Sequence, residues 1–231
     1  MGSRVLGIAR TQLVILTRRL HGRLIRTVLR SEPSRAVTLV AFDIVGFGKR
    51  QSDEQARVRR RLFATANLIK NRLGGRLAYG VLDRGDGVLV VLPTSVDPLH
   101  LLGEVLPDVA ESIDDDNRVS GGDTMILRCV IHKGEAERDR WGWVGQDVNL
   151  VFRLLDSRTL RLRRKERGRR SPVTVALSEA IYRDACERLG DRTALENEIG
   201  KRWHDSLEKH LFRVKDFKQH AWVASVGAPS H

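Results

Sequence analysis

The sequence is poor in cysteine, in aromatic residues and in long apolar runs. Its two cysteines, Cys129 and Cys186, supply neither a disulfide framework nor a zinc-ligand spacing, so we expect a reducing, cytoplasmic location. No run approaches the ~20 apolar residues that a membrane-spanning helix needs. Hydrophobic residues still make up 41% of the 231, which excludes a disordered chain. The length predicts one mixed domain over 35–228, preceded by a basic helical segment over 1–34.

Acidic residues are fewer than basic ones, but the excess of basic residues is confined to two stretches. The net charge is +12, of which residues 1–30 carry +7 and residues 158–170 another +7, so the rest has a net charge of −2. A near-neutral body argues against a nucleic-acid-binding core, and we expect no nucleic-acid partner. Residues 5–30 are expected to form a helix that packs on the domain, with contact to a membrane surface as the less favoured alternative.

The order of apolar runs and turn signals predicts an α/β (α+β) fold. The β-branched run at 37–44 predicts a central buried strand, and Ser52 with Gln55 offers a capping box for a helix. The first half fits a ferredoxin-like βαββαβ core with helices on one face, and extra strands follow towards the C-terminus. Further predicted elements are a hairpin over 76–93, a helix from Asp97-Pro98, a strand at 124–135, a helix over 145–156, a loop or frayed helix at 158–170, a strand at 173–178, a helix from about 178 and a C-terminal hairpin.

Two aspartates are brought together by this predicted sheet. Asp43 ends the buried strand, and Asp86 lies in the Gly-Asp-Gly turn of the hairpin beside it. Taken singly, each is more simply a strand-end cap or a turn residue. Taken together, two close carboxylates repel each other unless cations lie between them. Oxygen ligands of this kind suit Mg²⁺ or Mn²⁺ completed by substrate phosphates, so the pair predicts a metal site.

A glycine-broken loop follows Asp43 directly. Gly46, Phe47 and Gly48 leave backbone N–H groups free to approach phosphate oxygens, because the glycines carry no side chain that blocks the way. The loop therefore predicts phosphate binding beside the metal site.

The segment GQDVNLVFRLLD, 145–156, predicts a helix that is apolar nearly all round. Asn149 and Arg153 are four residues apart and share one edge of it. Arg153 either pairs with a local acid, Asp147 or Asp156, or stabilises phosphoryl charge in a transition state.

In combination these motifs resemble the class III nucleotidyl cyclases, the adenylate and guanylate cyclase family. FDIVGF, the GDG turn and GQDVN-x₃-R carry the resemblance, and IHKGE at 131–135 resembles the family's strand that ends in His-x-Gly-Glu. The resemblance covers about 37–156 well and 173–226 loosely. It implies that a nucleoside triphosphate is converted to a 3′,5′-cyclic monophosphate and pyrophosphate.

The resemblance also implies roles for particular residues. Asp43 and Asp86, with the backbone carbonyl of Ile44, match the ligands of two Mg²⁺ or Mn²⁺ ions. Asn149 matches the residue that orients the ribose, and Arg153 the one that stabilises the α-phosphate. In the family the last two come from the partner subunit, so a head-to-tail homodimer with shared sites is implied.

A lysine near the C-terminal hairpin usually meets the β- and γ-phosphates in this family. Lys215 or Lys218 matches that position, and the local sequence does not separate them.

The base-reading positions depart from the family. They fall on Leu82 and Gly142, where adenylate and guanylate cyclases have polar residues. Strand alternation places Arg84 on the same face as Leu82, so Arg84 either takes over base recognition or pairs with Asp83.

Aromatic residues near these positions could stack on a base. Phe47, Trp141 and Trp143 are the candidates, with packing or dimer contact the simpler role for the tryptophans. The pattern also resembles the bacterial pyrimidine cyclases of anti-phage signalling, which make cyclic UMP or cyclic CMP.

The interpretation with most support is a cytoplasmic, homodimeric, metal-dependent nucleotidyl cyclase. The absent base readers favour a first rival, a catalytically silent cyclase-homology domain that senses nucleotides or dimerises. The two basic stretches favour a second, a nucleic-acid-binding module, although they lack interleaved aromatic residues.

Overall fold

The computed structural model describes residues 33–73, 79–120, 124–166, 171–200, 202–203, 206–214 and 217–227. The helix predicted over 5–30, its membrane contact and Lys215 lie outside these residues. Within them, no helix is both long and apolar enough to cross a membrane.

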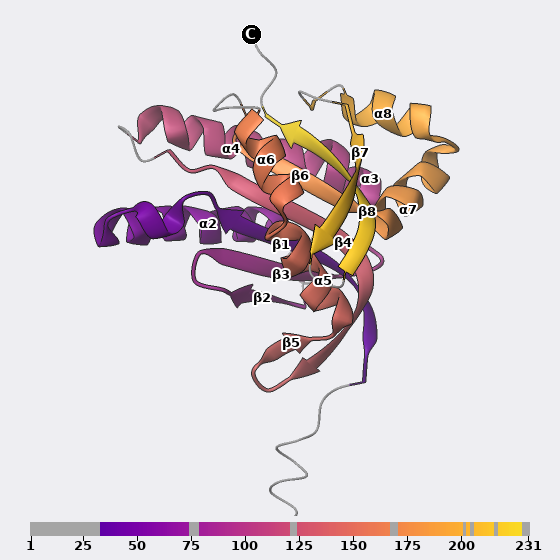
Figure 1. Ribbon diagram of the computed structural model, residues 1–231, viewed down its shortest axis with the longest axis horizontal. Coiled ribbons are helices and arrows are strands. Elements are labelled where there is room, and N and C mark those ends of the chain that lie inside the picture. Colours follow the sequence, from indigo (N-terminus) through magenta and orange to yellow (C-terminus); the bar gives the residue numbers. More distant parts are fainter. Residues whose placement is uncertain are drawn as a thin grey trace, which may run out of the picture.

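One mixed sheet organises the described chain (Figure 1). Its order is β2-β3-β1-β4-β6-β8-β7, and the short β5 pairs with the end of β4. Only β4 and β6 are parallel neighbours; the other pairs are antiparallel. The strands are β1 (Arg35–Ile44), β2 (Gly80–Asp83), β3 (Gly87–Pro93), β4 (Leu127–Asp139), β5 (Gly142–Val144), β6 (Val173–Ser178), β7 (Glu208–Val214) and β8 (Phe217–Val226).

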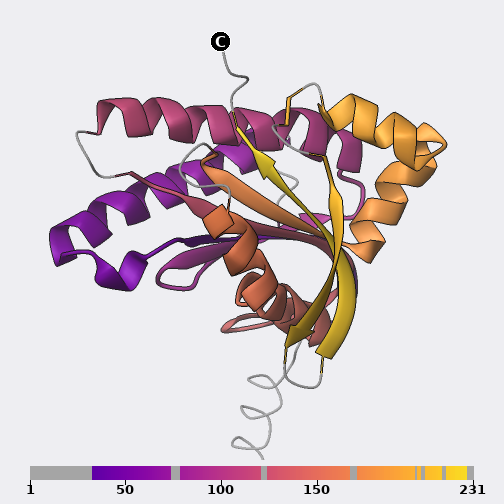
Figure 2. The same cartoon turned by 45° about the horizontal axis from the view of Figure 1, so that its top comes forward.

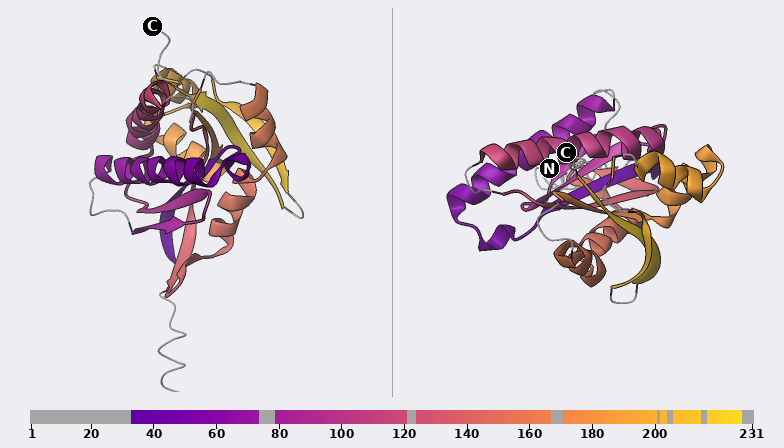
Figure 3. Two further views of the ribbon diagram at one scale, coloured as in Figure 1. Left: turned by 90° about the vertical axis from the view of Figure 1, so that its left-hand side faces the viewer. Right: turned by 90° about the horizontal axis from the view of Figure 1, so that it is seen from above.

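Helices cover both faces of the sheet (Figure 3). The first face carries α2, the continuous helical stretch α3–η2–α4, and α7 with α8, whereas α5 and α6 lie on the opposite face. Figure 2 shows the β7–β8 hairpin curving past α5. The helices are η1 (Phe47–Lys49), α2 (Ser52–Arg72), α3 (Pro98–His100), η2 (Leu101–Val105), α4 (Leu106–Val119), α5 (Gln146–Leu155), α6 (Arg158–Glu166), α7 (Glu179–Leu189) and α8 (Arg192–Gly200).

Strand β1 is buried on both faces because its side chains alternate between two cores. Val40, Phe42 and Ile44 join the core under α2 and α4, while Leu39 and Ala41 join the core under α5. Each large apolar side chain buried in this way stabilises the fold by about 1.5–3 kcal/mol. The predicted central strand and the ferredoxin-like βαββαβ core are confirmed, with the first two helices on one face.

Two local expectations need correction, and the structure decides between two alternatives at a third. The capping box of α2 lies one residue earlier than Ser52, since Gln51 is the N-cap and the Glu54 side chain accepts from its N–H at 3.3 Å. β4 runs on to Asp139 and forms an arm with β5. Of the two alternatives for 158–170, a loop or a frayed helix, the described residues 158–166 form a helix, with Leu160 buried in the α5 core.

Candidate active site

The structure places Asp43 and Asp86 side by side at one end of the sheet. Asp43 pairs with Gly87 across the β1–β3 ladder, and the Ile44 N–H donates to the Asp86 carbonyl at 2.9 Å. A Cβ at Gly87 would lie 2.5 Å from the Phe42 carbonyl oxygen, so only glycine lets the turn approach β1 this closely. The Gly-Asp-Gly turn thereby holds Asp86 next to Asp43.

Asp43 is a buried carboxylate that forms an ion pair with a cationic side chain. Its pKa is raised to about 6, chiefly by burial; the pairing with Arg128 acts against this rise, and the nearby Asp86 and Asp156 contribute to it. Arg128 lies directly opposite on β4, where its Nε donates to Oδ1 at 2.8 Å and its Nη2 donates to Oδ2. Position 43 therefore requires positive charge beside it.

This donor set fits a hard divalent cation. The described residues hold no group of three or more His, Cys, Asp or Glu side chains, so an ion here would rely on the two aspartates and on backbone, water or phosphate oxygens. Mg²⁺ and Mn²⁺ accept such a sparse set of oxygen ligands. Arg128 now holds both Asp43 oxygens and would have to yield one of them.

The loop after β1 is open above its glycines. Gly46 has φ 73°, which favours glycine, and it caps η1. Phe47 is partly buried and packs on the α2 core. A Cβ at Gly48 would meet no atom of the described chain within 4 Å. A ligand can therefore approach the backbone at Gly48.

The start of α5 is fixed by the His-x-Gly-Glu end of β4. Asp147 accepts a hydrogen bond from the Glu135 N–H at 2.6 Å, and its Oδ1 lies 3.2 Å from His132 Nε2. A Cβ at Gly134 would lie 2.5 Å from Asp147 Cγ, so glycine is needed beneath the carboxylate. These contacts set the position of α5 on the sheet.

Asn149 and Arg153 project from α5 into solvent. Both are exposed, and within the described ranges neither side chain has a hydrogen-bond or ion-pair partner. The local alternatives for Arg153 fail, because Asp147 is engaged with β4 and Asp156 makes no ion pair with it. No contact in the described part of the chain joins either residue to Asp43. The structure thus leaves two polar groups on one helix edge, apart from the aspartates.

Leu82 and Gly142, the two predicted base-reading positions, lie next to each other. A Cβ at Gly142 would lie 2.8 Å from Leu82 Cδ2. Both line a pocket of about 410 Å³ between β2 and the β4–β5 arm, together with Arg84. Arg84 does not pair with Asp83, whose carboxylate is taken by Arg59 at 2.7 Å.

The guanidinium of Arg84 lies over the Phe152 ring at 4.4 Å. It therefore sits against α5, with one face of its plane covered.

The two tryptophans of the β4–β5 arm have different environments. Trp143 is buried and stacks on Tyr79 with ring centroids 5.9 Å apart, which makes it a packing residue. Trp141 is 69% exposed, and Arg140 covers its ring at 4.0 Å. Lys218 is exposed at the start of β8.

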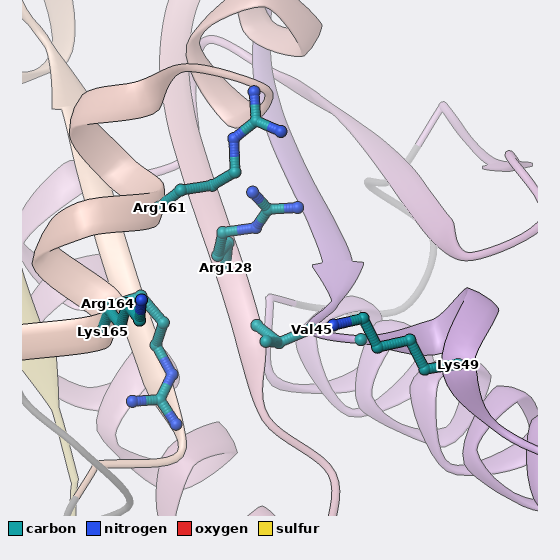
Figure 4. Close-up of a pocket in the computed structure, with 7 residues that line it drawn as sticks. Val45, Lys49, Arg128, Arg161, Arg164 and Lys165 are labelled. Carbon is teal, nitrogen blue, oxygen red and sulfur yellow. The ribbon is translucent and has the colours of Figure 1, made fainter.

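Two features were missed in the sequence. Arg128 is the one charged residue in the apolar run 125–131, and that isolation was a usable signal, because a charge in a buried strand needs a partner. The second is a basic pocket of about 710 Å³ beside the loop after β1, shown in Figure 4. Its lining includes Arg128 and three residues of α6. In the sequence, the α6 segment stands out only as part of one of two basic stretches.

Comparison with known proteins identifies the fold. No family model and no curated protein sequence matches the chain. Solved structures do. The guanylyl cyclase Cya2 superposes with a TM-score of 0.54 at 16% identity, over 87% of this chain and 96% of Cya2. The adenylyl cyclase CyaB from P. aeruginosa gives 0.54 at 14%, over 88% and 98% of the two chains.

A third neighbour was solved with a nucleotide analogue. The catalytic core of a rhodopsin-guanylyl cyclase with converted specificity, in complex with ATPαS, gives a TM-score of 0.51 at 17% identity, over 84% of this chain and 99% of that core. The chain therefore has the fold of nucleotidyl cyclase catalytic domains.

Proposed function

We propose that the protein is a nucleotidyl cyclase that converts a nucleoside triphosphate to its 3′,5′-cyclic monophosphate and pyrophosphate. The observation that carries the proposal is the juxtaposition of Asp43 and Asp86, joined through the Ile44–Asp86 hydrogen bond, on a sheet with the fold of adenylyl and guanylyl cyclases. The neighbour solved with ATPαS supports a triphosphate as the substrate class.

Asp43, Asp86 and the Ile44 carbonyl would hold Mg²⁺ or Mn²⁺. Such ions, when bound, make the 3′-hydroxyl a better nucleophile and neutralise charge on the phosphates. The chain's part is to keep the two carboxylates adjacent and to leave the Gly46–Gly48 backbone open to phosphate oxygens.

Asn149 and Arg153 supply the complementary half of the site from a second copy. Both are exposed, share one edge of α5 and lack partners within the described part of the chain. A head-to-tail homodimer would bring this edge to the aspartates of the other subunit, where Arg153 would stabilise charge on the α-phosphate and Asn149 would orient the ribose.

The two base-reading positions lack the polar side chains that adenylate and guanylate cyclases have there. Leu82 against Gly142 offers an apolar contact, and Arg84 is the polar group beside it. We propose a pyrimidine base, giving cyclic UMP or cyclic CMP, with Arg84 as the base-reading residue. A pyrimidine product would connect the protein to anti-phage signalling through the resemblance of its motifs.

The proposal is tested by turnover and by complementation. Purified protein is incubated with ATP, GTP, CTP or UTP and with Mg²⁺ or Mn²⁺, and products are identified by chromatography and mass. We expect one cyclic product, lost in Asp43→Ala and reduced roughly 10²–10³-fold in Arg153→Ala. Asp115→Ala, which removes a surface carboxylate paired with Arg118, is the matched control.

Mixing the two impaired variants, Asp43→Ala and Arg153→Ala, tests the shared site. A dimer of one Asp43→Ala chain and one Arg153→Ala chain contains one intact site, so the mixture should regain part of the wild-type rate. Activity retained in Asp43→Ala alone would overturn the metal assignment. Mixed variants that stay inactive would place both residues in one subunit's site. Nucleotide binding without turnover in the wild type would favour the silent, nucleotide-sensing domain, which the replaced base readers motivate.

A further inference from the structure

The pocket shown in Figure 4 is lined by positive charge from three separate elements. Lys49 comes from η1, Arg128 from β4, and Arg161, Arg164 and Lys165 from α6. Val45 and Gly46 complete the lining, so the pocket begins two residues beyond Asp43. Among the described lining residues there are five cations and no acid, and although Arg128 is paired with Asp43 behind the lining, such a group is stabilised by a multivalent anion.

Helix α6 is held so that its cations face this pocket. Leu160 is buried in the core under α5, and Arg163 pairs with Glu208 of β7 at 2.5 Å. Arg161, Arg164 and Lys165 stand at i, i+3 and i+4, so they share one face of α6, and all three line the pocket. The basic residues of α6 therefore include one that pairs with β7 and three that line the pocket.

Two of the pocket arginines are fixed in place. Arg164 is 7% exposed, and its burial lowers its pKa, the direction expected for a cation that has lost solvent. Arg161 is anchored by donating from Nη2 to the Asp156 carbonyl at the end of α5. Guanidinium groups preorganised in this way bind phosphate oxygens in pairs with little loss of side-chain entropy.

We propose that α6 is a phosphate-binding element, in which Arg161, Arg164 and Lys165 hold the polyphosphate of the substrate and the pyrophosphate product. This rests on the proposed function, and it assigns the cationic contacts to the same subunit that carries Asp43. A cavity of about 710 Å³ is the size of a small-molecule site, which favours a triphosphate over a nucleic-acid strand. Lys218 of β8 is not among the lining residues.

Binding of inorganic tripolyphosphate in EDTA tests the assignment without metal or turnover. Calorimetry on the full chain compares wild type with Arg161→Gln/Lys165→Gln, two exposed positions whose replacement leaves the buried Arg164 in place. The control is Arg118→Gln/Arg183→Gln, which removes two cations from surface ion pairs on α4 and α7. We expect the pocket variant to bind at least about tenfold more weakly and the control to bind as wild type does.

The outcomes separate this assignment from the proposed reaction. Equal binding by the pocket variant and wild type, absence of wild-type binding, or an equal loss in the control would each overturn it. Displacement of tripolyphosphate by a single-stranded oligonucleotide at lower phosphate concentration would also overturn it, in favour of a nucleic-acid surface. If tripolyphosphate binding depends on α6 but the protein cyclises no nucleotide, the phosphate site stands and the cyclase proposal is rejected. If the enzyme is active and the pocket variant has an unchanged KM, the cyclase proposal stands and the assignment of α6 to phosphate binding is rejected.

Discussion

Replacing Gly134 by alanine tests how firmly β4 positions α5. The new Cβ would lie 2.5 Å from both Asp147 Cγ and His132 Nε2, about 1 Å inside an ordinary van der Waals contact. β4 is held in place here, because Gly134 pairs with Val37 of β1 in a ladder that runs from Leu127 to Ala136 of β4. Asp147 must move instead, and with it the first turn of α5.

The expected cost follows from these two changes. Overpacking costs about 1–3 kcal/mol, and weakening the hydrogen bond between the Asp147 carboxylate and the Glu135 N–H adds about 1 kcal/mol or more. For a chain of this size, a loss of about 2–4 kcal/mol lowers Tm by roughly 5–15 °C. Because α5 carries Arg153, the proposed turnover should fall as well, even at temperatures where the variant remains folded.

Thermal unfolding followed by circular dichroism measures the effect against a matched glycine. A Cβ at Gly103, within the helical stretch η2, meets nothing within 4 Å, so Gly103→Ala should leave Tm unchanged or raise it slightly. The double variant Gly134→Ala/Asp147→Ala should lose less stability than the two single losses added, because removing the carboxylate makes room for the methyl group. A Tm of Gly134→Ala equal to or higher than that of Gly103→Ala would refute the reasoning.

Two further predictions concern buried ionisable groups. Arg128→Met should lower the free energy of unfolding in urea by about 3–5 kcal/mol, because it leaves the buried Asp43 without its cation; a loss under ~1 kcal/mol would show that the pair contributes no more than a surface pair. Burial lowers the pKa of His132, and Asp147 acts against this, so folding resists protonation of the ring. Stability should therefore fall as pH drops below the ordinary histidine pKa of about 6.5, where the unfolded chain takes up the proton. Tm measured between pH ~8 and ~5 should decline less in His132→Asn, and an identical decline in both proteins would contradict the assignment.

Most of the fold was predictable because its signals are local. The run 37–44 is apolar and β-branched, and only a strand buried on both faces satisfies it. Asp97 and Pro98 begin a helix as expected, with the Asp97 side chain accepting from the Leu99 N–H at 3.1 Å. The β4–β5 arm was harder to predict, since residues 137–140 are all charged and the strand there is defined by pairing with β5 rather than by burial.

The neighbourhood of Asp43 and Asp86 was also predictable, because strand order and a turn place them without any side-chain information. Arg128 was not anticipated, since a cross-strand pair depends on register, and register is fixed by the whole sheet. The register places Arg128 directly opposite Asp43, so one guanidinium both neutralises the candidate metal ligand and lines the basic pocket. The two candidate sites are consequently parts of one electrostatic unit.

The basic run at 158–170 shows why net charge per segment misjudges function. The net charge of the segment is +7, which by itself suggests a solvent-exposed surface segment. The described part of the run, residues 158–166, forms α6, and its side chains separate by direction: Arg163 pairs with Glu208, and Arg161 and Arg164 line the pocket. Burial of Arg164 costs desolvation energy, and a solvated tail would have no reason to incur it. The positive charge at α6 is thus fixed in space beside Asp43, where an anion with several charges gains most from it.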